Sequence, residues 1–154
     1  MDVLSRLAGE SVEAAEPIPP VVVQPDWSVR EVLAHLQSQD RSTALICDAG
    51  RLIGIFTERD AVRLMAHPAQ LDLPVSRFMS REPKTVARGD SIVSAIRLMA
   101  SGKCRRLPVV DERGLPTGII QTSGIVRLLV EYFPRCVYNL PPGPDSLIQD
   151  REGS

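Results

Sequence analysis

The sequence predicts a mixed α/β (α+β) fold in which two tandem β-α-β-β-α repeats pack with pseudo-two-fold symmetry. Two observations carry this prediction. Short apolar runs of strand length alternate with segments whose apolar residues recur at helical spacing. The same order of elements and turn residues then occurs a second time along the chain. One such unit has a small core, so the two copies are expected to stabilise each other by packing together.

The first repeat opens with a β-branched run, Val21–Val23, which predicts a short strand. Ser28 is placed to cap a helix whose apolar residues follow i, i+3, i+4, i+7 spacing. Residues 43–47 and 51–56 are both apolar, and the Asp-Ala-Gly turn between them predicts a hairpin. A second helix is expected over residues 58–66. The apolar residues predicted to be buried on it are Ala61, Leu64 and Met65.

The second repeat follows from matching the chain with itself. A shift of 63 positions aligns the first part of the two repeats, and the shift becomes 64 after a turn that is one residue longer in the second repeat. Both the apolar pattern and the turn residues agree, which indicates a tandem duplication. The matched pairs include Pro20 with Pro83, Ser28 with Ser91, Asp48 with Asp111, and Gly54 with Gly118.

This pattern divides the chain into four parts. Residues 1–17 form an N-terminal segment that is expected to contain a short helix. Residues 18–77 form the first repeat and residues 78–133 the second. Residues 134–154 form a C-terminal tail whose prolines exclude a regular element.

The composition limits the classes of function. The chain has 154 residues, 44% of them hydrophobic, and a net charge of −1, so it has no overall attraction for nucleic acid or acidic lipid. No apolar run approaches the roughly 20 residues that cross a bilayer. We therefore expect a cytoplasmic protein that contacts neither membrane nor nucleic acid.

The side chains that commonly carry chemistry are sparse. Three cysteines, Cys47, Cys104 and Cys136, show no CxxC spacing and favour reduced thiols over a disulfide framework. Only two histidines occur, and no metal-ligand cluster or catalytic set is evident. We expect no catalytic residue and no metal site.

The stretch from Gly54 to Asp60 is the main candidate for a functional site. Thr57 and Asp60 stand where an expected strand passes into a helix, which suits either a helix cap or half of a ligand site. The second repeat has Gln121 and Gly124 at these two positions. Thr122 or Ser123 is expected to cap the second helix, so the fold does not require the acid that only the first repeat keeps.

The sequence resembles the CBS-domain family, specifically a stand-alone tandem CBS pair (a Bateman module), over about residues 18–131. The resemblance implies a regulatory module, not an enzyme, that binds an adenosine-containing ligand between its repeats: AMP, ADP, ATP or S-adenosylmethionine. It also implies a homodimer and an unidentified effector protein as partners. Three motifs carry it, namely Gly54-Ile-Phe-Thr-Glu-Arg-Asp60, Phe78-Met-Ser80 with Pro83-Lys-Thr-Val86, and Arg105-Arg-Leu-Pro-Val-Val-Asp111.

The resemblance also assigns roles to individual residues. The Asp60 carboxylate would accept hydrogen bonds from both ribose hydroxyls, and Thr57 would reach the ribose or phosphate. The other repeat would complete the site with Lys84, Thr85 and Val86 beside the base and with Arg105 and Arg106 at the phosphates. The alternatives are that Asp60 only caps its helix and that the arginines are solvated strand ends.

Two hypotheses follow. In the first, the chain is a sensor that binds one adenine nucleotide or S-adenosylmethionine in the Asp60 cleft, while the Gly124 cleft binds no nucleotide in the same manner. In the second, the chain is a structural or interaction module that keeps the fold and binds no nucleotide.

Overall fold

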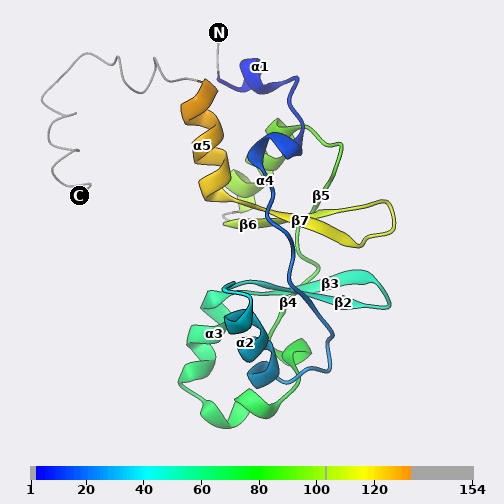
Figure 1. Ribbon diagram of the computed structural model, residues 1–154, viewed down its shortest axis with the longest axis vertical. Helices are drawn as coiled ribbons and strands as arrows, with labels where there is room; N and C mark the ends of the chain where they lie inside the picture. Colours follow the sequence, from blue (N-terminus) through cyan, green and yellow to red (C-terminus); the bar gives the residue numbers. More distant parts are fainter. Residues whose placement is uncertain (1–2, 103, 133–154) are drawn as a thin grey trace, which may run out of the picture.

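The computed structural model describes residues 3–102 and 104–132. Two lobes lie one above the other, each made of a small sheet covered by helices (Figure 1). The predicted α/β fold with two repeats is therefore confirmed. The expected tail at 134–154, and Cys136 within it, lie outside the described residues. Among the described residues, none of the helices combines the length and the apolar character needed to span a bilayer.

The lower lobe contains a sheet of four strands in the order β1-β2-β3-β4, with two α-helices against it (Figure 1). The strands and helices predicted for the first repeat are all present, with ends within two residues of those expected. Their bounds are β1 Val22–Val23, α2 Val29–Ser38, β2 Ala44–Asp48, β3 Arg51–Phe56 and α3 Glu58–Met65, followed by short 3-10 turns at Pro68–Asp72 and Val75–Arg77 and by β4 Ser80–Arg81.

The upper lobe contains a sheet of three strands in the order β5-β6-β7. Its elements follow the same β-α-β-β-α order as those of the first repeat. Their bounds are β5 Val86–Ala87, α4 Ile92–Gly102, β6 Arg106–Val110, β7 Pro116–Gln121 and α5 Thr122–Tyr132.

Strand register confirms the duplication residue by residue. Val23 pairs with Ile46 in the first repeat, and Val86 pairs with Val109 in the second, which is the same pair shifted by 63 positions. Each hairpin also has an irregularity in register directly after the second of these residues. A shared irregularity of this kind is a feature of the fold that both copies retain.

The two lobes exchange short segments. β4, which lies at the start of the second repeat, pairs with β3 of the first. In the same way Ile18, at the start of the first repeat, forms an antiparallel bridge with Ile119 on β7. Each sheet is thus completed by a segment of chain that leads into the other repeat, and this ties the lobes together.

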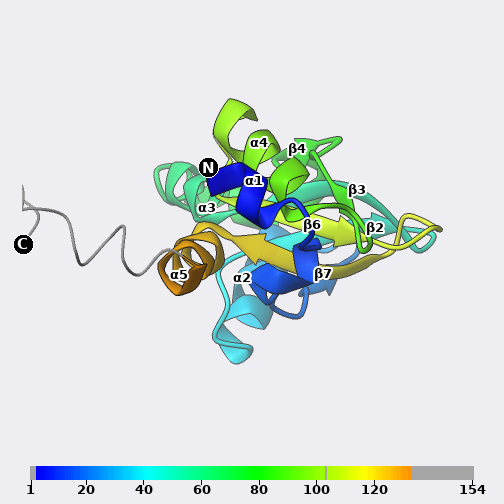
Figure 2. The same cartoon turned by 90° about the horizontal axis from the view of Figure 1, so that it is seen from above.

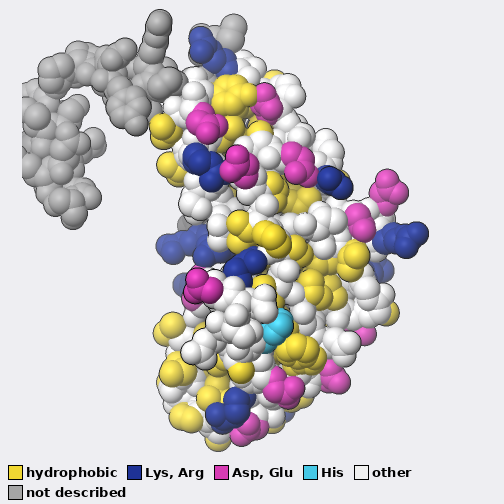
Figure 3. Space-filling model, viewed as in Figure 1, with side chains coloured by type: hydrophobic (Ala, Val, Ile, Leu, Met, Phe, Trp, Pro, Cys, Tyr) yellow, Lys and Arg dark blue, Asp and Glu magenta, His cyan; other side chains and the backbone are white. Residues whose placement is uncertain are grey.

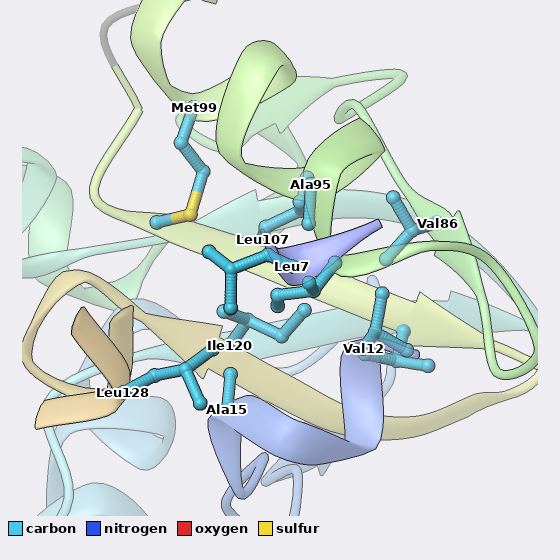
Figure 4. Close-up of a cluster of buried hydrophobic side chains, with 11 residues drawn as sticks. Leu7, Val12, Ala15, Val86, Ala95, Met99, Leu107, Ile120 and Leu128 are labelled. Atoms are coloured by element: carbon cyan, nitrogen blue, oxygen red, sulfur yellow. The ribbon is translucent and has the colours of Figure 1, made fainter. Parts of the chain in front are cut away.

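The N-terminal segment belongs to the core of the upper lobe. It forms a five-residue helix, α1 (Val3–Leu7), and a 3-10 turn, η1 (Val12–Ala15). Leu7, Val12 and Ala15 are buried among side chains of the second repeat (Figure 4). Seen from above, α1 lies beside α4, while α5 lies at the margin of the lobe (Figure 2).

Met65 corrects one expectation about the core. It was predicted to be buried, but 68% of its surface is exposed. Leu64, one position earlier, is in the core as predicted, and the helix turns Met65 toward the side that no described residue covers. Val62 on the same helix is 70% exposed.

Candidate functional site

Asp60 is anchored at the start of α3 by the backbone that precedes it. One carboxylate oxygen, Oδ2, accepts a hydrogen bond from the Thr57 N–H at 3.0 Å and a longer one from the Thr57 hydroxyl at 3.5 Å. Both residues are half-buried. The second oxygen, Oδ1, has no hydrogen bond to any described residue. Because a carboxylate has about four lone-pair positions, Asp60 keeps the capacity to accept further donors.

Asp60 therefore acts as a helix cap, but the second repeat shows that the fold does not need one there. At α5 neither Thr122 nor Ser123 makes a side-chain hydrogen bond to a described residue, so the expectation that one of them caps this helix is wrong. The strand instead runs directly into the helix, and the Thr122 N–H donates to the Arg105 carbonyl oxygen at 3.3 Å.

Arg106 reaches from the second repeat to the start of α3. Its Nη2 donates to Oε1 of Glu58 at 2.7 Å, and the same oxygen accepts the Ser42 hydroxyl at 2.9 Å. Glu58 is the residue directly after Thr57, so this ion pair places Arg106 beside the Asp60 motif. The sequence pattern identified Arg106 but not Glu58 or Ser42. A glutamate at an exposed helix position gave no signal of its own.

Arg105 adds a second positive charge at the same junction. Its side chain is exposed, and its guanidinium forms no ion pair with a described residue. Lys and Arg side chains gather where the two lobes meet on the face shown in Figure 3. A guanidinium group suits an anionic group, because it presents planar N–H donors.

The segment from Lys84 to Val86 is placed differently from the other candidates. Val86 is 3% exposed and packs in the upper core (Figure 4), so its side chain has little surface left to cover an adenine ring. Thr85 is exposed. The Lys84 ammonium lies at the end of α4, where a methyl group on Gly102 would stand 3.0 Å from Nζ. A helix C-terminus attracts a cation, which explains that position.

The equivalent position in the second repeat is occupied by the N-terminal segment. Gly124 stands where Asp60 stands in the first repeat, and it is buried. One turn further along α5, Arg127 Nη2 donates to the Ala15 carbonyl oxygen at 3.2 Å and lies 3.0 Å from a carboxylate oxygen of Glu16. The chain's own backbone therefore lies where a ligand would meet a carboxylate.

Two surface hollows lie elsewhere on the upper lobe. One, of about 360 Å³, lies between residues of α1 and α4, and the other, of about 480 Å³, lies beside the turn between β6 and β7. Neither is lined by Thr57, Asp60 or Arg106. Within residues 3–102 and 104–132, no group of three or more His, Cys, Asp or Glu side chains is arranged to hold a metal ion.

Comparisons with known proteins agree on one family. The CBS domain matches twice, over residues 14–67 and 75–131. A CBS domain-containing protein from Bacillus subtilis is 32% identical over 99 residues, which cover 64% of this chain and 70% of that protein. An inosine-5'-monophosphate dehydrogenase from Aquifex aeolicus is 36% identical over 112 residues, which are 71% of this chain but only 22% of the enzyme.

Solved structures agree with this match. The structure of CBSX2 in complex with AMP has a TM-score of 0.68 and 27% identity, and it covers 80% of this chain and 98% of that one. A CBS-domain containing protein from Agrobacterium tumefaciens has a TM-score of 0.66 and 29% identity, over 76% of this chain and 97% of that one. Since two CBS domains match most of the chain and the fold has the same two repeats, the chain belongs to the CBS domain family.

Proposed function

We propose that this chain is a regulatory sensor that binds one adenosine-containing ligand, such as AMP, ADP, ATP or S-adenosylmethionine, at the Asp60 site. The observation that carries this proposal is the ion pair of Arg106 with Glu58, which brings the second repeat to the start of α3, where Asp60 also lies. The first repeat supplies the Asp60 carboxylate, whose second oxygen is available to ribose hydroxyls. The second repeat supplies the Arg106 guanidinium, which bonds Glu58, the residue that follows Thr57. Charge-assisted hydrogen bonds of both kinds are the strong ones.

Two relatives support the choice of ligand class. The CBSX2 structure contains AMP. The cytosolic domain of the Mg²⁺ channel MgtE, described in complex with ATP, is 28% identical and has a TM-score of 0.62. The match covers 71% of this chain and 44% of that one, so less than half of the MgtE chain is shared. These are properties of those proteins, and their family likeness makes the same chemistry the first to test here.

We infer a regulatory rather than a catalytic role, and Asp60 as the main ribose contact. Thr57, Arg105 and Arg106 are proposed to contact the ligand with their side chains. Lys84, Thr85 and Val86 would contribute through their backbone, because Val86 is buried. The site includes residues of both repeats, so a bound ligand would change the packing of one repeat against the other and against a partner.

A thermal-shift panel with AMP, ADP, ATP and S-adenosylmethionine tests the proposal. A ligand present at 100 times its dissociation constant should stabilise the wild type by about 2.7 kcal/mol. Asp60→Ala should abolish most of that shift. If no adenosine compound stabilises the wild type, the chain is an interaction module without a nucleotide.

Asp90→Ala is the matched control for the lost hydrogen bond between a carboxylate and the backbone N–H three residues earlier. Its carboxylate accepts the Ala87 N–H at 2.8 Å across three residues, as Asp60 accepts that of Thr57, but it lies away from the Asp60 site. Asp90→Ala should keep the full ligand shift. Equal losses of the ligand shift in both variants would mean that Asp60 acts only through the local fold.

We also propose that the protein forms a homodimer through α3 and α5. Val62 and Val126 occupy equivalent positions of the two repeats, shifted by 64, and are 70% and 57% exposed. The two helices follow one another along the same side of the molecule in Figure 1. A second copy related by a two-fold axis could cover both helices at once, since each copy would present the same patch.

A further inference from the structure

The ion pair between Glu58 and Arg106 has a consequence for which ligands the site accepts. We infer that the Glu58 carboxylate occupies the place of a ligand phosphate on Arg106 and thereby disfavours phosphorylated adenosine compounds relative to uncharged or cationic ones. This inference rests on the proposed function, because it concerns the same site. Glu58 would then be a residue that determines specificity, not one that binds the nucleoside.

The geometry shows that Glu58 is held firmly. Its Oε1 accepts two hydrogen bonds, one from Arg106 at 2.7 Å and one from the Ser42 hydroxyl at 2.9 Å. Ser42 precedes β2 of the first repeat, and Arg106 begins β6 of the second. The carboxylate is therefore in contact with both repeats.

Arg106 is the most buried partner among the ion pairs of the described residues, and Glu58 opposite it is 47% exposed. The Arg106 side chain is 20% exposed, whereas Arg30 and Asp72, which also form an ion pair, are 61% and 71% exposed. Water screens a charge pair less when one partner is buried. Arg106 Nε is also buried and has no hydrogen-bond partner among the described residues. Glu58 is thus the one described carboxylate that neutralises this guanidinium.

A phosphate that approached Arg106 would meet the Glu58 carboxylate on the same guanidinium. It would have to displace that carboxylate or share the arginine with it, and two anions at that separation repel each other. Adenosine lacks the phosphate and meets no such competitor. An adenosyl compound with a positive charge, such as a sulfonium, would be attracted by Glu58. The bias acts on the charged end of the ligand and leaves ribose binding at Asp60 unchanged.

Glu58→Gln tests this effect because glutamine removes the negative charge and keeps an acceptor oxygen for Arg106 and Ser42. Calorimetric titration of the full chain would give the dissociation constants of AMP and of adenosine. We expect AMP to bind Glu58→Gln about tenfold more tightly than wild type, a change of about 1.4 kcal/mol. The affinity for adenosine should stay the same.

Glu13→Gln is the matched control. Glu13 is also paired with an arginine, since its Oε1 lies 3.2 Å from Nε of Arg88, but it is far along the chain from the site. This variant has the same change in net charge, so it should leave the ratio of AMP to adenosine affinity unchanged. If the ratio rose in both variants, the change in net charge alone would explain the effect, and the inference would be overturned.

Two other results would also overturn it. An unchanged ratio in Glu58→Gln would show that the carboxylate does not compete with phosphate. A lower AMP affinity would show that Glu58 orients Arg106 for the ligand.

Thermal shift with tripolyphosphate supplies a readout without adenosine. If no adenosine compound binds any variant, the proposed function fails. A larger tripolyphosphate shift in Glu58→Gln than in wild type would still support the competition, and equal shifts would overturn it.

Discussion

Gly124 lies directly against the backbone of Ala15. A methyl group on Gly124 would stand 2.5 Å from the Ala15 carbonyl oxygen, closer than such atoms approach in proteins. The second repeat therefore lacks more than the carboxylate of Asp60, since it has no room for any side chain at that position. Glycine at 124 and the N-terminal segment over it are two halves of one packing arrangement.

Gly124→Ala should therefore destabilise the protein, although alanine favours a helix by about 1 kcal/mol over glycine. The clash is with backbone, which cannot rotate away, so we expect a net loss of about 1–3 kcal/mol. Urea denaturation measures it. Ser123→Ala on the exposed side of the same helix should change the free energy of unfolding by less than about 0.5 kcal/mol. A Gly124→Ala protein as stable as wild type would contradict the packing.

The fold could be predicted from the sequence because its signals are local. The predicted β3 ends match the structure, and Ser28 caps α2 as expected, accepting the Glu31 N–H at 3.1 Å while its own N–H donates to Glu31. The path of the N-terminal segment could not be read in the same way. Its few apolar residues fit a short helix, but only the fold shows that Leu7 and Val12 complete the core of the second repeat.

The candidate site could be predicted only in part. Asp60 stood out because the second repeat lacks it. Glu58 did not stand out, because its role depends on an arginine 48 residues away that the strands bring beside it. The Val86 position could be located from the repeat, but which way its side chain points depends on how the sheet packs, and it points into the core.

Gly54→Ala should also be destabilising, through contact with a side chain. An added methyl group would overlap Sδ of Met79, which is buried. Methionine can move, but a packed core leaves it little space, so we expect a loss of about 1–3 kcal/mol in thermal or urea unfolding. Gly89→Ala is the control, because nothing lies within 4 Å of the added group. If both substitutions lowered the free energy of unfolding by the same amount, the Met79 contact would not be the cause.

Cys47 should react with thiol reagents much more slowly than Cys104. Burial raises the pKa of the Cys47 thiol, so less of it is thiolate, the reactive form, at neutral pH. Its rate should rise as the pH increases toward that raised pKa. Cys104 is only half-buried. Timed alkylation with peptide mass spectrometry on a Cys136→Ser background compares the two, and faster labelling of Cys47 in the folded protein would contradict its burial.

Val62→Glu should shift the proposed homodimer toward monomer. The change puts a charge into the centre of the expected interface, where an unpaired buried charge is strongly unfavourable. Sedimentation velocity on the full chain measures the mass. Leu115→Glu is the control, because Leu115 is 42% exposed and lies on the hairpin turn of the upper lobe. A wild-type monomer at all concentrations would exclude the dimer and leave the exposed helices to another partner.

Arg127→Ala should loosen the N-terminal segment without unfolding the domain. Arg127 holds the Ala15 carbonyl oxygen and Glu16, but its side chain is 48% exposed, and an exposed ion pair contributes only about 0–1 kcal/mol. The global stability should thus change little, while amide hydrogen exchange of residues 12–16 should become faster. Arg63→Ala tests the same change at the equivalent position of the first repeat, where the exposed arginine has no ion pair with a described residue. Since the segment is also fixed by buried Val12, an unchanged exchange rate in Arg127→Ala would show that apolar packing alone keeps it over Gly124.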